Sequence, residues 1–198
     1  MLQRLRLPFD VVSPDVDETP LPGEAPHALA LRLSRAKAQV VSQATPGALV
    51  IGSDQVATVD GLTLGKPGNH AAAVAQLTQM SGREVEFHSA LSVTDGQRME
   101  TSDIVTRCVF RALEASEIQA YLLAEQPYDT AGSAKAETLG IALMDSMSSD
   151  DPTAIIGLPL IELSRMLRSF GINPLCPPAG FGRGTLDADS GRPTGEQA

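Results

Sequence analysis

Residues 49–67 read LVIGSDQVATVDGLTLGKP, and the expected fold follows from this segment. An apolar run opens the segment and breaks at Gly52, and Asp54 follows at the end of the run. A second apolar stretch leads to Asp60-Gly61, a dipeptide typical of a β-hairpin turn, and the hairpin returns to Lys66. The segment therefore predicts a carboxylate at the mouth of a buried strand, with a lysine brought back near it. Ligands bind just beyond such strand ends in open α/β sheets, so we expect the binding site here.

Length and composition bound the class of protein. A chain of 198 residues suits one domain, or one domain with a tail, and a hydrophobic content of 42% allows a full core. The formal net charge of −9 argues against a surface that binds duplex nucleic acid irrespective of sequence, so no nucleic-acid partner is expected. An acidic protein that binds an anionic substrate needs local lysines, a divalent cation, or both.

The sequence predicts neither a membrane partner nor secretion. The longest apolar stretch near the C-terminus, residues 154–161, is far shorter than a membrane-spanning helix. The N-terminus passes from basic residues into Pro8 without the apolar region of a signal peptide. Two cysteines, Cys108 and Cys176, are too few for a disulfide framework and lack zinc-binding spacing. We therefore expect a cytoplasmic protein.

Apolar periodicity and turn residues predict alternating helices and strands along the chain. Helices are expected at residues 1–7, about 26–44, 69–82, 113–124 and 159–171. Strands are expected at residues 9–12 and on both sides of a turn at Asp95-Gly96, whereas residues 147–152 have the composition of a polar loop. From Cys176 onward the chain is rich in small and polar residues, so we predict one domain over residues 1–175 and a disordered tail over 176–198.

Asp54, followed by Gln55, has two interpretations. The first is a turn residue or helix cap. The second is a carboxylate that holds a divalent cation and activates water. A bound cation would also allow phosphate groups to approach the carboxylate of this acidic protein.

Three lysines stand out by context or position. Lys37 belongs to the helix expected at residues 26–44, Lys66 lies between glycine and proline, and Lys135 lies in the glycine-flanked segment AGSAKAETLGI, residues 131–141. All are compatible with ordinary surface positions, but lysine also binds phosphate as a compact point charge. The sequence contains neither a Walker loop nor GxGxxG, and no Ser/His/Asp or Cys/His arrangement that would favour acyl transfer can be assembled.

Glu137, in the same segment as Lys135, also has two interpretations. It either pairs with a nearby cation or reads a nucleotide base. A carboxylate accepts hydrogen bonds from the N1–H and N2–H₂ edge of guanine, and it favours a purine that carries positive charge.

Several motifs taken in order resemble those of the Maf-like nucleotide pyrophosphatases, also called septum formation inhibitor proteins. They are VDE at 16–18, GSDQV at 52–56, GKP at 65–67, AGSxKxE at 131–137 and IGLPL at 156–160. The resemblance covers about residues 1–175. It implies an α/β fold with a mixed twisted sheet and flanking helices, like that of inosine triphosphate pyrophosphatases. It also implies a nucleotide substrate and, because family members are often dimeric, a homodimer.

GSDQ together with AGSxKxE is similar to the branch of the family that acts on 7-methyl-GTP. The resemblance implies hydrolysis between the α- and β-phosphates, with a divalent cation (Mg²⁺ or Mn²⁺) as cofactor. It implies that Asp54 is the proton acceptor and binds the metal together with Glu18, and that Gln55 and Glu137 govern base choice. The residues expected around the phosphates are Lys37, Lys66 and Lys135. Alternative activities are a dTTP/UTP pyrophosphatase and a catalytically inactive nucleotide-binding protein that influences cell division.

The N-terminus departs from the family pattern. Family members begin with a strand and a loop of the form SxSPxR, which contacts the triphosphate, whereas this sequence starts inside the helix that follows. We therefore expect the first strand of the fold to be missing. Either the start codon has been placed too late, or the protein lacks a strand and a phosphate-binding loop.

Overall fold

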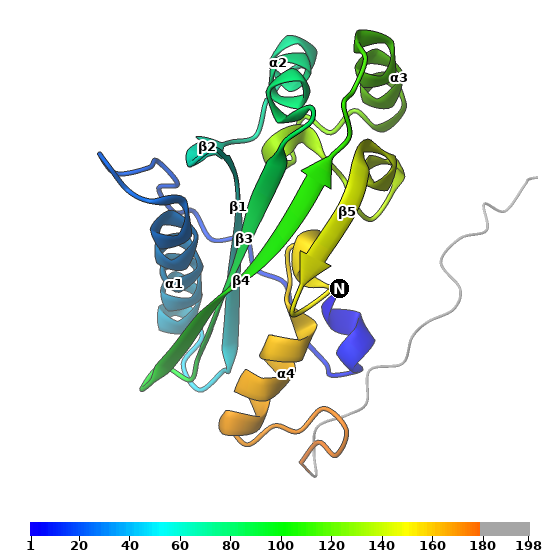
Figure 1. The fold of residues 1–198 in the computed structure, drawn as a ribbon. Coiled ribbons are helices and arrows are strands. Elements are labelled where there is room, and N and C mark those ends of the chain that lie inside the picture. The colour runs from blue at the N-terminus through cyan, green and yellow to red at the C-terminus, as the bar shows by residue number, and fades with distance from the viewer. Residues whose placement is uncertain (179–198) are drawn as a thin grey trace, which may run out of the picture.

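An antiparallel five-stranded sheet forms the centre of the computed structural model, which describes residues 1–178 (Figure 1). Its strand order is β2-β1-β3-β4-β5. The strands are β1 (Val50–Val59), β2 (Leu62–Leu64), β3 (Glu84–Thr94), β4 (Met99–Phe110) and β5 (Met144–Ser149). The expected α/β class with helices flanking a sheet is confirmed. The parallel pairing that a mixed sheet would include does not occur among the described residues, because tight hairpins join β1 to β2 and β3 to β4 and the other two pairings also run antiparallel.

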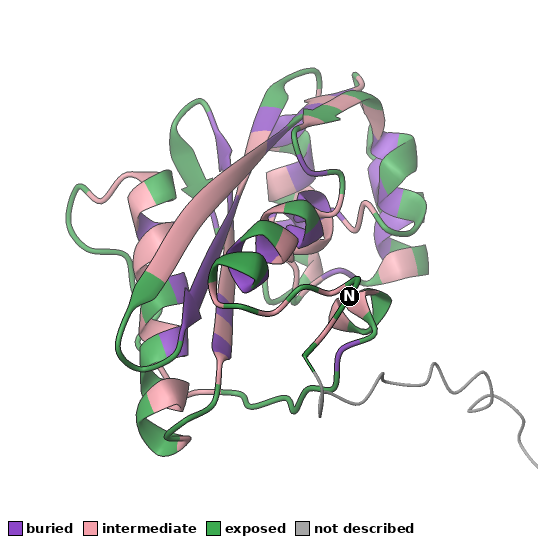
Figure 2. Cartoon of the chain, turned by 90° about the horizontal axis from the view of Figure 1, so that it is seen from below, coloured by how far each residue is buried: buried purple, intermediate pink, exposed green. Residues whose placement is uncertain are grey.

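Helices cover both faces of the sheet. They are α1 (Pro26–Ala44), α2 (His70–Met80), α3 (Ala115–Glu125) and α4 (Leu160–Ser169), with short 3₁₀ helices η1 (Leu2–Leu5), η2 (Ala131–Ser133), η3 (Leu139–Leu143) and η4 (Ala154–Ile156). Figure 1 shows α1 apart from the other helices. It packs Leu29 and Leu33 on Val56 and Ala90, while α2, α3 and α4 pack on sheet residues of the opposite face. Figure 2 shows buried positions on the sheet strands and on the helices.

Local signals in the sequence set most element boundaries. Pro26 occupies the first turn of α1, and the side chain of Asn69 accepts a hydrogen bond from the backbone N–H of Ala72 (2.9 Å) at the start of α2. Asp60 and Gly61 both have positive φ values (50° and 76°), as a two-residue hairpin turn requires. The helices predicted at about 26–44, 69–82, 113–124 and 159–171 are therefore confirmed, as is the hairpin around Asp95-Gly96.

Gly52 does not end the first strand, so the expectation that Asp54 lies at a strand mouth is wrong. Both residues lie inside β1, which continues to Val59. A Cβ at Gly52 would lie 2.4 Å from the backbone oxygen of Ser34 and 2.7 Å from the backbone nitrogen of Ala38. Glycine is therefore needed here because α1 packs directly on the strand.

Three other expectations are wrong. Residues 9–12 form no strand, and Val11 is exposed. The helix expected at residues 1–7 is a single 3₁₀ turn, η1, because so short a helix is marginal. Residues 147–149, expected in a polar loop, belong to the edge strand β5, whose pairing with β4 outweighs its weakly strand-forming sequence. The tail predicted from residue 176 lies mostly outside the described residues.

The first part of β1 has an open edge. β2 pairs only with residues 57–59, whereas β3 pairs with all of β1, so residues 50–56 have one strand neighbour within the described chain. Side chains on the two faces of β1 can therefore both border a cavity at this edge. None of the helices in residues 1–178 has the length and apolar composition needed to cross a membrane.

Candidate active site

A cavity of about 650 Å³ lies along the open edge of β1. This volume is within the range of small-molecule sites, roughly 300–1,000 Å³. Its walls come from α1, β1, the end of β2, the segment around Gly157 and residues 129–137. The structure brings together nearly all the predicted site residues here: Glu18, Lys37, Asp54, Gln55, Lys66 and Glu137.

Lys37 bridges two carboxylates in the cavity. Its Nζ lies 2.6 Å from Oδ1 of Asp54 and 2.7 Å from Oε1 of Glu18. Asp54 points from β1 toward α1, where Lys37 lies in the turn after Leu33, a residue buried against the sheet. The side chain of Asp54 is 11% exposed and that of Glu18 is 47% exposed. The cluster therefore has a buried end on the sheet and an open end on the loop before α1.

The environment shifts the pKa values of the three groups. Burial raises the pKa of Asp54 above its ordinary value, and the hydrogen bond from Lys37 opposes this effect without cancelling it. Burial lowers the pKa of Lys37, but its hydrogen bonds to Asp54 and Glu18 outweigh burial, so the net shift is upward. The hydrogen bond from Lys37 lowers the pKa of Glu18. Lys37 therefore stays cationic, while Asp54 is a desolvated carboxylate of raised basicity.

Asp54 and Glu18 fit a divalent cation as a partial ligand set. Residues 1–178 contain no group of three or more histidine, cysteine or acidic side chains that could hold a metal by themselves. Mg²⁺, however, is commonly held by one or two carboxylates together with substrate phosphates and water. The carboxylates that converge on Lys37 match that requirement when a triphosphate supplies further oxygens.

Gln55 points to the opposite face of β1 from Asp54, because successive strand residues alternate. Its Nε2 lies 3.0 Å from Oγ of Ser89, 3.1 Å from the backbone oxygen of Ala154 and 3.1 Å from that of Ile155. Ser53, on the same face, donates to the backbone oxygen of Gly157 (2.8 Å). These contacts hold the segment 154–157 against the sheet, where it forms one wall of the cavity.

Lys66 reaches the cavity by the hairpin that the sequence predicted. It follows β2, and the side chain of Gln76 donates to the backbone oxygen of the preceding Gly65 (2.8 Å), which anchors this return segment to α2. Lys66 and Asp54 line the same cavity although they belong to different segments.

The segment AGSAKAE packs against β1 by means of Gly132. This residue has a φ of 68°, and a Cβ in its place would lie 3.2 Å from that of Ala57. Further along, the backbone N–H of Lys135 donates to the hydroxyl of Tyr121 (3.0 Å). The backbone is thus fixed on both sides of Ala134, and Glu137 is presented to the cavity.

Lys135 is the predicted site residue that does not line the cavity. Its Nζ lies 3.9 Å from Oδ1 of Asp129, which does line it. The side chain of Asp129 is 86% exposed, so this ion pair is at the surface. A role for Lys135 toward phosphate stays a prediction.

Sequence reasoning did not identify Ser53, Ser89 or the backbone of residues 154–157 as parts of the site. Ser89 is fully buried, and it also donates to the backbone oxygen of Ala154 (2.7 Å). One signal was present: Ser89 occupies an inward position in a strand whose other inward residues include Phe87 and Leu91. A polar side chain there needs a partner, which indicates a hydrogen-bonded feature on that face.

Comparison with known proteins gives consistent matches. A family model described as Maf-like protein matches residues 1–170. A protein of Bordetella avium (strain 197N) named 7-methyl-GTP pyrophosphatase is 69% identical over 179 residues, which cover 90% of this chain and 91% of that one. A protein of Burkholderia thailandensis with the same name is 62% identical over 176 residues, covering 86% and 82% of the two chains.

Proposed function

The chain belongs to the Maf-like protein family, and from this premise we propose that it hydrolyses 7-methyl-GTP to 7-methyl-GMP and pyrophosphate. Such an enzyme removes modified nucleotides from the pool. The observation that carries the proposal is the Asp54 carboxylate, which is largely shielded from solvent in a cavity that also contains Lys37, Lys66 and Glu137. The names and high identity of the relatives support the substrate.

Asp54 is the proton acceptor in this proposal. Its raised basicity suits the removal of a proton from the water that attacks the phosphoric anhydride. Lys37 holds the carboxylate in place, and Lys66 contacts the phosphates as a point charge. Asp54 and Glu18 would hold a Mg²⁺ or Mn²⁺ ion, which supplies Lewis-acid stabilisation of the phosphate charge when bound.

Glu137 contributes base recognition. Its carboxylate accepts hydrogen bonds from the N1–H and N2–H₂ edge of guanine, and its negative charge favours the cationic 7-methylated ring. A net charge of −9 makes a nucleic-acid partner unfavourable, in keeping with a free nucleotide as substrate. A cytoplasmic location and a homodimer complete the proposal.

The test is pyrophosphate release from 7-methyl-GTP, GTP, dTTP and UTP with Mg²⁺ or Mn²⁺. We expect 7-methyl-GTP to have the highest kcat/KM. Asp54→Asn should lower kcat by about 10²–10⁴-fold, the usual contribution of a general base. Asp145→Asn is a matched control, because Asp145 is an exposed carboxylate outside the cavity. Equal or higher activity on dTTP and UTP would overturn the substrate assignment, and full activity of Asp54→Asn would overturn the mechanism.

A further inference from the structure

The side-chain amide of Gln55 has a fixed orientation. Its Nε2 faces two backbone carbonyl oxygens, those of Ala154 and Ile155, and carbonyl oxygens only accept hydrogen bonds. The atom that faces them must therefore be the NH₂ group rather than the amide oxygen. The assignment follows from the partners and excludes the flipped amide.

The hydroxyl of Ser89 gives the amide nitrogen of Gln55 a third acceptor. This hydroxyl donates its single proton to the backbone oxygen of Ala154 at 2.7 Å, so toward Gln55 its oxygen acts as an acceptor at 3.0 Å. The two amide protons of Gln55 thus face three acceptors and leave none for a ligand. Its Oε1 receives no hydrogen bond from the residues described, and Gln55 lines the cavity.

We infer that Ser89 is a positioning residue: it donates to the Ala154 carbonyl and accepts from Nε2, and so helps to hold Gln55 as an acceptor-only contact for the nucleotide base. The inference rests on the proposed function, since it assigns this wall of the cavity to the base. Ser89 is fully buried beneath Gln55 and does not line the cavity, so it acts through Gln55.

An acceptor-only Gln55 selects the chemistry of the base. Together with Glu137, it gives the cavity two side chains that only accept hydrogen bonds from a base. Guanine and 7-methylguanine present adjacent donors, N1–H and N2–H₂. Adenine presents an acceptor at N1 and only a C–H at C2 in place of these donors, so neither protein oxygen would receive its hydrogen bond. The loss of these hydrogen bonds discriminates against adenine, because a buried polar group without a partner costs free energy.

The substitution Ser89→Ala removes the oxygen that accepts from Gln55 and leaves Ala154 without its hydroxyl partner. The two carbonyl groups still exclude the flipped amide, so we expect Gln55 to keep its orientation but to be held less firmly, and its Oε1 to be presented less accurately to the base. KM for 7-methyl-GTP should then rise about tenfold, as for the loss of one hydrogen bond, with little change in kcat. The preference in kcat/KM for 7-methyl-GTP over ATP should fall by a similar factor. Ser89→Thr keeps the hydroxyl and should restore both values.

Ser92→Ala is the matched control. Ser92 lies on the same strand, is equally buried and also makes side-chain hydrogen bonds, to Ser34 (2.9 Å) and Thr101 (3.1 Å). It lies on the α1 face of the sheet, away from Gln55. If Ser89→Ala and Ser92→Ala change KM and the preference over ATP equally, the effect is general loosening and the inference is overturned.

A second measurement does not require turnover. The side-chain ¹⁵N–¹H₂ signals of Gln55 in the free protein should show slow hydrogen exchange, which accelerates at least about tenfold in Ser89→Ala and not in Ser92→Ala. Unchanged exchange in Ser89→Ala would overturn the inference. Absence of pyrophosphate release from every nucleotide by the wild-type protein would instead overturn the proposed function, while the exchange measurement still tests the role of Ser89.

Discussion

Gly52 controls the distance between the strand that carries Asp54 and the helix that carries Lys37. We predict that Gly52→Ala destabilises the protein by about 1–3 kcal/mol, because the new Cβ would overlap backbone atoms of Ser34 and Ala38 rather than a flexible side chain. Displacement of α1 should also lower kcat by at least about tenfold, since small misplacements of catalytic groups are costly. Urea unfolding and pyrophosphate release measure the two effects.

Gly65→Ala is the control for the stability effect. A Cβ at Gly65 would meet no atom within 4 Å, so its unfolding midpoint should stay close to that of the wild type. Equal stability of Gly52→Ala and Gly65→Ala would show that α1 does not need the close contact.

The hydrogen bonds of Glu24 predict a second single-residue effect, on the free energy of unfolding at acid pH. The hydrogen bond from Arg32, with a further one from the backbone of Leu21, lowers the pKa of Glu24 from 4.5 to about 2. A carboxyl group whose pKa is lower in the folded than in the unfolded state stabilises the folded state. This contribution is complete above the unfolded pKa and is lost as the pH falls toward the folded pKa. The wild type should therefore lose unfolding free energy more steeply than Glu24→Gln between about pH 4.5 and pH 2.

Urea unfolding at a series of pH values measures this difference. Glu84→Gln, which removes an exposed carboxyl without an ion pair in the described structure, should keep the slope of the wild type. The same slope for Glu24→Gln and the wild type would contradict the prediction. The ion pair of Glu24 with Arg32 also fixes the loop that carries Glu18, because Arg32 donates to the backbone oxygen of Thr19 (3.0 Å) in that loop. Glu24 therefore affects the active site only indirectly, through the position of Glu18.

At the scale of elements, Asp151 connects helix α4 to the cavity wall. This fully buried carboxylate accepts from the backbone N–H groups of Ile161 (2.6 Å) and Glu162 (3.2 Å) at the start of α4. It also accepts from the backbone and hydroxyl of Thr153 (3.0 and 2.7 Å), just before η4. The Asp151 side chain thus accepts hydrogen bonds from free backbone N–H groups at the N-terminus of α4. It also orients the turn whose carbonyl groups accept hydrogen bonds from Gln55.

We predict that Asp151→Ala lowers the free energy of unfolding by about 1–3 kcal/mol, because buried donors lose their charged acceptor. It should also raise KM for 7-methyl-GTP, since η4 is loosened. Asp145→Ala removes an exposed carboxylate and should change neither quantity. Chemical denaturation and steady-state kinetics are the measurements, and an Asp151→Ala protein as stable as the wild type would refute the role of this carboxylate.

The sequence predicted the elements whose boundaries depend on local chemistry. Helix α1, the cap at Asn69 and the hairpin at Asp60-Gly61 are specified by proline, asparagine and glycine in the segments themselves. β5 could not be predicted, because its polar sequence becomes a strand only by pairing with β4. Gly52 was misread for the same reason: its role depends on a helix that lies earlier in the chain.

The site was predicted to a similar extent. Asp54 and Glu137 were identified by motif and Lys37 through the family resemblance. All three line one cavity, but their contacts could not be derived from spacing. The role of Ser89 could not be predicted, because its partner atoms belong to a backbone segment more than sixty residues later in the chain. Residues that hold another side chain in place carry little signal in their own sequence context.

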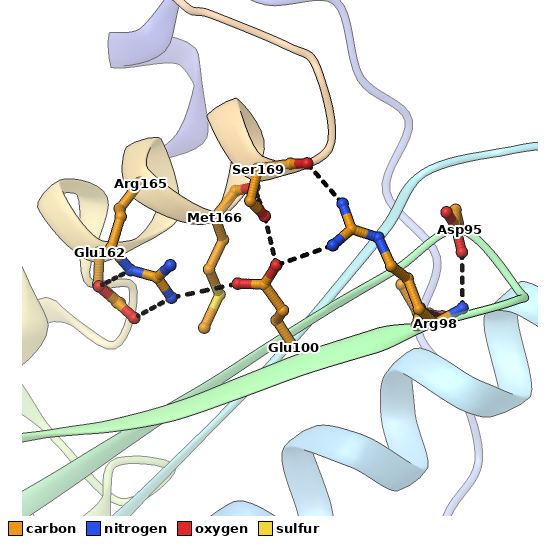
Figure 3. A network of polar contacts seen from close by, with 8 residues as sticks. Asp95, Arg98, Glu100, Glu162, Arg165, Met166 and Ser169 are labelled. Carbon is orange, nitrogen blue, oxygen red and sulfur yellow. Dashed lines mark hydrogen bonds and ion pairs between the residues drawn. The ribbon is translucent and has the colours of Figure 1, made fainter.

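For the whole molecule, two kinds of contact hold α4 to the sheet. Figure 3 shows the polar contact, in which the carboxylate of Glu100 on β4 forms ion pairs with the guanidinium groups of Arg98 and Arg165 (both 3.3 Å). Arg98 also donates a hydrogen bond to the backbone oxygen of Ser169. The side chains of the two arginines are each 50% exposed. The other contact is apolar: Leu163 and Met166 of α4 are fully buried in a cluster with Leu7, Leu91 and Val93.

The apolar contact should dominate the stability of this half of the protein. Leu163→Ala removes a fully buried side chain and should cost about 2–5 kcal/mol. Glu100→Gln should cost less than about 1 kcal/mol, and its effect should diminish at high salt, because exposed ion pairs are weak and screened. Urea unfolding at low and high salt compares the two variants. A larger loss for Glu100→Gln would mean that the polar network, rather than the buried cluster, keeps α4 and the cavity wall before it on the sheet.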